Sequence, residues 1–427
     1  MRTILICTVG GTHEPIIRAI KQNYPDFVHF ICSDDSESAK GSYVQVTGEG
    51  KVLKSKSDLE KPDLPNIVVL TELSEDRYEV HKIKELDDLQ TCYLEAVSLI
   101  EQIHRDYPHA RIVVDYTGGT KSMSAGLAAA ALDDGRCEIQ LVTGIRADLQ
   151  KVARKTESVR PARVWDVQAK RRMNLAKEFM KRYDFSGAER LLEETLARFV
   201  GDKTKDTLQR WLTLCRAFDA WDRFDHQTAS ILLKPYRKDF VEYCKFLDSI
   251  LLGEAAHGFE LVEDLILNAE RRAVQGRFDD AIGRLYRALE LTAQRWLELK
   301  YGIKTSDVDL QKVPPESRAN LERYRNDKGQ IQIGLWRAWE LIGEMGQSDP
   351  LGDLFTQHRS RLLDFLKLRN QSLFAHGTSP IEEGNFRNCE RLLSDFLYGA
   401  IDRAVSSLGK KRTTRLAQFP TEMREMC

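Results

Sequence analysis

The residues best suited to chemistry in this chain lie in one short stretch near its carboxyl end. Arg369 and His376 are seven positions apart, Asn370 follows the arginine, and Gly377 follows the histidine. Seven positions are almost two turns of an α-helix, so we expect both side chains on one face, about 10 Å apart along the axis. A fixed cation and a group that titrates near neutrality are what metal-free cleavage of an RNA phosphodiester needs.

The same stretch also fits the plain end of a helix. A helix that stops at Gly377 in a left-handed cap commonly carries basic residues in its last turn, where they meet the negative end of the helix dipole. His376 then contributes only a favourable charge. On this interpretation the neighbouring apolar residues belong to the core, namely Leu366, Leu368, Leu373 and Phe374. The stretch alone does not decide between the two interpretations.

Length and charge limit what the chain can be. At 427 residues it is long for one hydrophobic core, which favours two or three domains. Its 64 lysines and arginines nearly cancel its 65 aspartates and glutamates, so any nucleic-acid contact must be local. No run approaches the roughly 18 apolar residues of a membrane span, and the amino terminus shows no cleavable signal pattern. We therefore expect a cytoplasmic protein that does not associate with membranes.

The cysteines give no sign of a metal centre. None of the eight forms a Cys-x-x-Cys pair or stands with histidines at metal-ligand spacing. Cys7, Cys32 and Cys137 lie in or beside apolar strand-like runs, where we expect them to be small buried hydrophobes. This cysteine usage fits a reducing cytoplasm, and it predicts neither a metal ion nor a cofactor.

The first part of the chain, residues 1–165, alternates between strand-like and helix-like segments. The pattern predicts strands at 3–7, 27–32, 67–70, 111–115 and 138–143, and helices at 15–21, 86–106 and 122–132. Such alternation indicates an α/β domain with a mainly parallel, doubly wound Rossmann-like sheet. We interpret residues 33–65 as a long polar loop and residues 151–165 as a closing hairpin.

From residue 166 onward the pattern is helical as far as about residue 408. Apolar residues recur at helical spacing, as at Ile282, Leu285, Leu289 and Trp296, so this half is predicted to be all-α. Two similar segments, 185–192 and 278–285, both fit the tight turn of a helical hairpin. Residues 302–329, with a Pro-Pro pair and many charges, are predicted to be an exposed connection.

Two glycine-rich loops lie where ligands bind in α/β sheets, after the carboxyl ends of strands. The first is residues 8–15 (TVGGTHEP) and the second is residues 115–123 (DYTGGTKSM). Paired glycines let a backbone approach a ligand closely, and the helix that follows each loop offers free N–H groups to a phosphate or a base. Hydroxyl groups and one cation add to the second loop: Thr117, Thr120, Ser122 and Lys121.

Three other interpretations of these loops are possible. A Walker A loop needs glycine directly before lysine, but Thr120 stands between Gly119 and Lys121. A dinucleotide fingerprint needs the pattern G-x-G-x-x-G, which the first loop lacks. Each loop alone could be a tight turn that happens to use glycine. Two such loops in one sheet favour a nucleotide or oligonucleotide site.

The loop 117–121 (TGGTK), paired with 9–12 (VGGT), resembles a CARF domain, the CRISPR-associated Rossmann-like sensor. The Arg369-Asn370…His376-Gly377 segment, in a helical carboxyl-terminal domain, is similar to the HEPN ribonuclease motif. Together they resemble the CARF–HEPN accessory ribonucleases of type III CRISPR systems. The resemblance implies a CARF domain at 1–165, a helical linker at 166–260 and a HEPN-like domain at 261–427.

In that family the sensor domains pair across a two-fold axis and hold a cyclic oligoadenylate between them. The resemblance therefore implies a homodimer, whose symmetry suits such a ring. Carried onto this chain, the ring-binding residues are Gly10, Gly11, Thr12, Thr117, Gly118, Gly119, Thr120 and Lys121, with Ser33 and Thr143 at the ends of neighbouring strands. The size of the ring and any cleavage of it by the sensor stay open.

For the helical domain, the resemblance implies cleavage of single-stranded RNA without a metal ion. His376 is then a general acid or base, Arg369 stabilises charge on the phosphoryl oxygens, and Asn370 orients the phosphate. One arginine–histidine pair cannot close on a phosphate, which implies a composite pocket from two protomers. Arg284, Arg287 and Glu290 either line an RNA groove or form a solvated face with internal charge pairing. The competing function is a ligand-sensing regulator or scaffold without catalysis.

Overall fold

The computed structural model describes residues 2–37, 40–47, 66–143, 158–162, 164–197, 201–252, 256–346, 348–373, 375, 377–412 and 415–421. His376 and Phe374 lie outside the described residues. The chain divides into two compact units, residues 1–170 and 171–427. The division falls within helix α6 (Trp165–Lys181), five residues beyond the predicted boundary.

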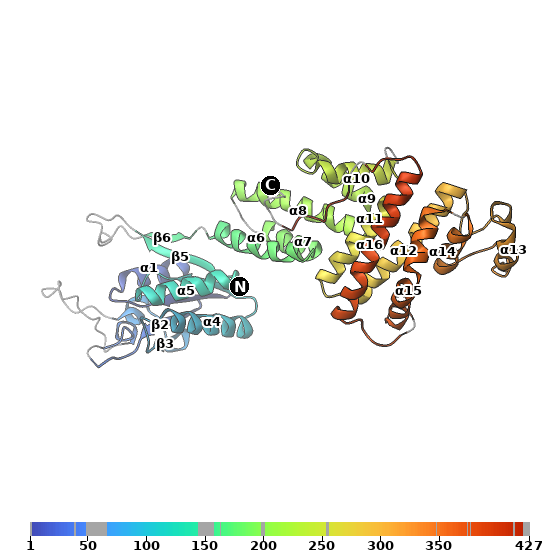
Figure 1. Ribbon diagram of the computed structural model, residues 1–427. Helices are drawn as coiled ribbons and strands as arrows, with labels where there is room; N and C mark the ends of the chain where they lie inside the picture. The colour runs from blue at the N-terminus through green and yellow to red at the C-terminus, as the bar shows by residue number, and fades with distance from the viewer. Residues whose placement is uncertain are drawn as a thin grey trace. The chain divides into compact units, whose positions relative to one another are not determined.

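The first unit is built on one six-stranded sheet (Figure 1). Its strand order is β3-β2-β1-β4-β5-β6, and every neighbouring pair is parallel except β5 and β6. The strands are β1 (Thr3–Thr8), β2 (Phe27–Ser33), β3 (Tyr78–Ile83), β4 (Arg111–Asp115), β5 (Glu138–Thr143) and β6 (Ser158–Pro161). The prediction of a mainly parallel Rossmann-like sheet is confirmed.

Alternate residues of the central strands enter two separate cores, because successive side chains of a strand point to opposite faces. Ile4 and Ile6 pack with helices α4 (Leu89–Asp106) and α5 (Lys121–Asp134), whereas Leu5 and Cys7 pack with α1 (Glu14–Asn23) and α3 (Ile67–Thr71). Burial on both faces explains why these strands are continuous apolar runs. Close packing of α5 on α4 requires small residues in α5, since a Cβ at Gly126 would lie 2.8 Å from the Tyr93 backbone nitrogen of α4.

Two local predictions in this unit are wrong. Residues 67–70 form helix α3 rather than a strand, and the Asn66 side chain caps it by accepting a hydrogen bond from the Val69 N–H. A four-residue apolar run does not distinguish a strand from a buried helical turn. The strand is β3, which was missed because it is an edge strand with polar residues facing outward.

The predicted loop at 33–65 contains the short helix α2 (Val44–Thr47), and its residues 38–39 and 48–65 lie outside the described residues. The predicted hairpin at 151–165 is represented by β6, which pairs antiparallel with β5. Its residues 151–157 and 163 also lie outside the described part of the chain.

The second unit is helical, as predicted (Figure 1). Its helices, after the end of α6, are α7 (Phe185–Leu196), α8 (Asp202–Asp222), α9 (His226–Leu233), α10 (Val241–Leu252), α11 (Glu260–Val274), α12 (Phe278–Tyr301), α13 (Pro315–Glu322), α14 (Leu335–Glu344), α15 (Pro350–Gln371) and α16 (Glu383–Ser407). The main core lies among α11, α12, α14, α15 and α16, with Trp296 and Trp339 fully buried.

The two similar sequence segments begin helices α7 and α12, each just after a helical hairpin turn. A third hairpin, between α8 and α9, has the same form and was not recognised in the sequence. A residue with positive φ makes each turn, namely Tyr183, Phe224 and Gly276. Residues 302–329 are not a simple exposed connection, because they contain α13 and bury Ile303 and Val308 in the core.

Among the helices in the described part of the chain, none combines the length and the hydropathy of a membrane-spanning segment.

Candidate functional site

The two glycine-rich loops of the first unit lie against each other. Strands β1 and β4 are parallel neighbours with Cys7 opposite Asp115, so the loops that follow them leave the sheet side by side. The Thr8 hydroxyl donates a hydrogen bond to the Gly118 carbonyl at 2.6 Å and so ties the loops together. The structure thus brings the predicted glycine loops together at the carboxyl ends of the strands.

Glycine is required at two of these positions by the packing of one loop on the other. A Cβ at Gly118 would lie 2.2 Å from the Thr8 carbonyl oxygen, and a Cβ at Gly10 would lie 2.6 Å from the Gly119 nitrogen. Gly119 has a φ of +81°, a conformation that favours glycine. Gly11 has open space on its side-chain side and is exposed, so its backbone is open to a ligand.

Most hydroxyl groups of the second loop already have partners inside the protein. Thr120 caps helix α5 by accepting from the Met123 N–H, and it donates to the Leu86 carbonyl at 2.6 Å. The Thr117 hydroxyl oxygen accepts a hydrogen bond from the Val142 N–H. These threonines therefore shape the loop more than they offer free donors.

Thr12 and Lys121 are the exposed polar side chains of the two loops. Within the described residues, the Lys121 ammonium has no carboxylate within ion-pair distance. It stands at the first position of α5, where the N–H groups of the first turn have no partner inside the helix. An unpaired cation beside a helix N-terminus is a suitable place for a phosphate group.

Ser33 and Thr143 are the last residues of β2 and β5, at the same end of the sheet as the glycine loops. The Ser33 and Ser42 residues exchange two hydrogen bonds, each backbone N–H donating to the other's hydroxyl oxygen. The Thr143 hydroxyl is 3.5 Å from the Ser158 carbonyl. Beneath the loops, burial raises the pKa of Asp115, whose carboxylate accepts from the Thr117 N–H and from Gln140.

The second group of candidate residues lies at the end of helix α15. The helix ends at Gln371, and Ser372 has extended backbone angles, so the expectation of one helix that carries both Arg369 and His376 is wrong. His376 follows in the sequence between α15 and α16 and lies outside the described residues.

Gly377 has a different role from the predicted left-handed cap. It is absent from the positive-φ residues of the described chain. A Cβ at this position would lie 1.7 Å from the Gln371 carbonyl oxygen, so only glycine allows the chain to turn back against the helix end. The Gly377 N–H donates to the Ser372 carbonyl at 3.2 Å. Glycine at position 377 thus lets the chain pass close to the end of the arginine-bearing helix.

Helix α15 is attached to α12 at both ends. At its start, Asp349 caps α15 and accepts hydrogen bonds from the Trp296 indole and the Tyr301 hydroxyl of α12. After its end, one Asp279 oxygen of α12 accepts from the Leu373 N–H at 3.1 Å and the other from the Ile381 N–H at 3.0 Å. Asp279 therefore holds both ends of the connection that carries position 376.

The Arg369 guanidinium is held by an aromatic face rather than by a carboxylate. Its central carbon lies 4.3 Å from the ring centroid of Tyr286 on α12, and it donates to the Asn370 side chain at 3.2 Å. Among the described residues, no carboxylate forms an ion pair with it. The guanidinium is oriented and yet keeps donors for an anionic group. Leu373, expected in the core, is 61% exposed.

Sequence reasoning did not select Asp279 or Tyr286, because each is remote from Arg369 along the chain. The only available signal was the Asp-Asp pair after Phe278 at the start of a predicted helix. Arg284, Arg287 and Glu290 of α12 form charge pairs within their own helix, which is the second of the two interpretations given for them. Arg287 pairs with Glu290 at 2.5 Å, and Arg284 pairs with Asp280 at 3.1 Å.

Asp279 is expected to act as a positioning residue for this connection. Asp279→Asn keeps the size but replaces one acceptor with a donor that faces a backbone N–H, so we expect about a 10-fold loss of kcat for any RNA cleavage at this site. The matched control is Asp280→Asn, because Asp280 pairs with Arg284 and does not contact the connection. Equal kcat values and equal melting temperatures in the two variants would contradict this role.

Comparison with known proteins adds two findings. Residues 254–399 match the family model of the Csm6 HEPN domain, a range that contains Asp279, Tyr286, Arg369 and Asn370. The fold is similar to that of Csm6 from Enterococcus italicus, solved bound to cyclic hexa-2'-fluoro-hexa-dAMP. The TM-score is 0.58 at 12% identity, and the alignment covers 97% of this chain and 96% of that one. No curated protein sequence matches the chain.

The family match lies in the unit that carries the arginine segment, and the shared fold extends over both units. Residues 254–399 therefore carry a domain that matches the Csm6 HEPN family, in a chain that shares the fold of Csm6 over both units.

Proposed function

We propose that this protein is an endoribonuclease of type III CRISPR defence that cleaves single-stranded RNA, without a metal ion, when its sensor unit binds a cyclic oligoadenylate. The observation that carries the proposal is the Csm6 HEPN match over a segment whose arginine is oriented and, among the residues that the structure describes, forms no ion pair. A solvated structural arginine would be expected to pair with one of the many carboxylates of this charge-balanced chain.

In the proposed reaction, the 2′-hydroxyl of the RNA attacks the adjacent phosphorus and the bond to the 5′-oxygen of the next nucleotide breaks. The products are a 2′,3′-cyclic phosphate and a 5′-hydroxyl. His376 transfers a proton in this step, from the 2′-hydroxyl or to the leaving oxygen. Arg369 contacts the non-bridging oxygens, where negative charge develops, and Asn370 orients the guanidinium through their hydrogen bond.

The activator is proposed to lie over the loops after β1 and β4. Lys121 and the first turn of α5 supply a cation and free N–H groups for a phosphate, and the exposed Gly11 backbone leaves room for the ring. Gly10, Thr117, Gly118, Gly119 and Thr120 shape this surface through their contacts with one another. Thr12, Ser33 and Thr143 lie at the same carboxyl end of the sheet as these loops.

Two protomers are proposed to form each functional site. A ring with internal symmetry matches a two-fold interface between sensor units, and one histidine cannot serve as both acid and base at one phosphate. A homodimer supplies two arginines and two histidines. We therefore expect specific activity to fall as the protein is diluted below its dimer dissociation constant.

The experiment is an RNA cleavage assay in the presence of EDTA. The full chain is incubated with labelled single-stranded RNA alone, with linear oligoadenylate, and with cyclic tetra- or hexa-adenylate. The hexameric ring is included because Enterococcus italicus Csm6 was solved with a ring of that size. We expect cleavage with one cyclic activator and background cleavage otherwise. Cleavage only with added divalent metal would contradict the proposed chemistry.

The competing function is a sensor that regulates a partner without catalysis. It predicts that a cyclic oligoadenylate binds and that no ring size produces RNA cleavage. Direct binding measurements by calorimetry, made on the same protein, separate this outcome from a sensor that does not bind the ring at all.

A further inference from the structure

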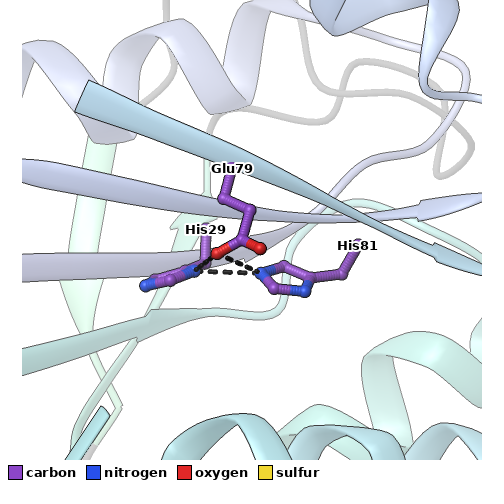
Figure 2. A group of neighbouring side chains, drawn as sticks. All are labelled: His29, Glu79 and His81. Atoms are coloured by element: carbon purple, nitrogen blue, oxygen red, sulfur yellow. Dashed lines mark hydrogen bonds and ion pairs between the residues drawn. The ribbon is translucent and has the colours of Figure 1, made fainter. Parts of the chain in front are cut away.

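His29 of strand β2 faces Glu79 and His81 of the neighbouring edge strand β3 (Figure 2). In the parallel pairing of β2 with β3, His29 stands opposite Glu79. His81 is two residues beyond Glu79 on β3, so its side chain lies on the same face as that of Glu79. His29 is 50 and 52 positions from Glu79 and His81, so sequence spacing does not reveal the cluster.

The three potential ligand atoms form a compact triangle. His29 Nδ1 is 2.9 Å from His81 Nε2, and Glu79 Oε2 is 3.6 Å from each of these nitrogens. A point equidistant from all three atoms lies about 2 Å from each, which is the length of a bond from Zn²⁺ to an imidazole nitrogen or a carboxylate oxygen. An ion at that point would replace the hydrogen bond between the two imidazole nitrogens.

The electrostatic state of the cluster also suits a cation. Burial, followed by the neighbouring His81, lowers the pKa of His29 to about 3. Burial likewise lowers the pKa of His81, while Glu79 and Glu95 of α4 act in the opposite direction. The Glu79 and Glu95 carboxylates provide negative charge beside the two imidazoles.

The cluster is open to solvent at Glu79 and His81. The His29 side chain is 9% exposed, whereas those of His81 and Glu79 are 29% and 56% exposed. His81 also lines a cavity of about 100 Å³ between the sheet and α4, together with Glu95, Ser98 and Gln102. An ion held by the three ligands would keep one position open to water.

A second group of possible ligands in the same unit, His104, Asp134 and Cys137, is less suitable. Asp134 is already engaged by Arg136 at 2.7 Å, and the Cys137 thiol donates to Asp134. Burial raises the pKa of Cys137, so the thiolate that a metal would need is disfavoured.

We propose that His29, Glu79 and His81 bind one Zn²⁺ ion through Nδ1, Oε2 and Nε2, with a water at the fourth position. Two histidines and one carboxylate form a known three-residue ligand set for zinc, with a site left open. The ion would link the edge strand β3 to β2 and so stabilise the sensor unit. The site lies within these strands, with His29 and Glu79 in their amino-terminal halves and His81 near the middle of β3, whereas the candidate activator loops follow carboxyl ends.

The test uses the full chain, freed of metal with EDTA and then desalted. Titration with Zn²⁺ in competition with a chromophoric chelator is expected to give one ion per chain. His81→Gln and Glu79→Gln each remove a ligand and should weaken binding by at least about 100-fold. Zn²⁺ should raise the melting temperature of the unsubstituted protein and leave that of the variants unchanged. His109→Gln is the control, because His109 is an exposed histidine of the same unit outside the cluster.

Co²⁺ provides a second readout that separates the two ligand groups. Binding by His29, Glu79 and His81 predicts visible bands without thiolate charge transfer, and Cys137→Ser should leave them unchanged. If His81→Gln does not fold, Glu79→Gln decides the matter, because the Glu79 side chain is largely exposed. The proposal is overturned if no ion binds, if binding is unchanged in these variants, or if Cys137→Ser abolishes it. Since the readout is metal binding, its result does not depend on whether the protein cleaves RNA.

Discussion

Arg369→Ala is expected to lower the activator-dependent rate of RNA cleavage by about 100- to 1,000-fold, the usual effect of removing one group that stabilises transition-state charge. The guanidinium is oriented by the Tyr286 ring and by Asn370, and within the described residues no carboxylate competes for it. Its other donors are therefore available for a phosphate. Single-turnover cleavage of a labelled RNA with saturating activator measures the loss.

The chain offers a matched control for this experiment on the same helix. Arg361 is an exposed arginine of α15, two turns before Arg369, and Arg361→Ala should leave the rate within about two-fold of the original. Arg369→Lys keeps the charge but loses the bidentate geometry, so an intermediate rate is expected. His376→Ala should match Arg369→Ala in size. Equal rates for the Arg369→Ala and Arg361→Ala variants would refute the proposed role of Arg369.

Lys121→Ala is expected to raise the activator concentration needed for half-maximal cleavage by about 10- to 100-fold, because one charge-assisted contact to a phosphate contributes about 1.5–3 kcal/mol. The maximal rate at saturating activator should not change, since the substitution is in the sensor unit and the reacting groups are in the helical unit. Activation curves with the effective cyclic oligoadenylate, together with calorimetric binding, measure both quantities.

Lys21→Ala is the control for Lys121→Ala. Lys21 is an exposed lysine in the last turn of α1, at the opposite end of the sheet layer from the glycine loops. It tests whether the loss of any positive charge weakens activation, since long-range attraction of an anionic ring depends on total charge. A shift of the same size in both variants would show that Lys121 makes no specific contact. A lower maximal rate in Lys121→Ala would instead indicate a defect in signal transfer or folding.

Much of the α/β unit was predictable because its central strands are buried on both faces. The runs at β1 and β4 are continuously apolar between their end residues, and those at β2 and β5 are mostly apolar, which indicates burial on both faces. The edge strand β3 was missed, and α3 was taken for a strand, because a half-exposed strand and a short apolar helix carry weaker patterns. The long helices were recognisable from their periodic apolar faces.

Local sequence selected the candidate site residues: the arginine and asparagine of α15, the glycine after position 376, and the glycine loops with Lys121. These selections depend on local composition and on order along the chain, which a sequence carries in full. It also suggested the wrong geometry for the arginine segment, because helical periodicity continues in the pattern beyond Gln371, where the helix ends.

Only the tertiary structure decided how these residues are held. Asp279 is 94 and 102 residues from the backbone groups it binds, and His29 is 52 residues from His81. Gly377 is required by a contact with the Gln371 carbonyl, and Gly118 by a contact with the Thr8 carbonyl. Such requirements arise from the approach of distant backbone segments. No local pattern encodes that approach, because it depends on how the strands pair and how the helices pack.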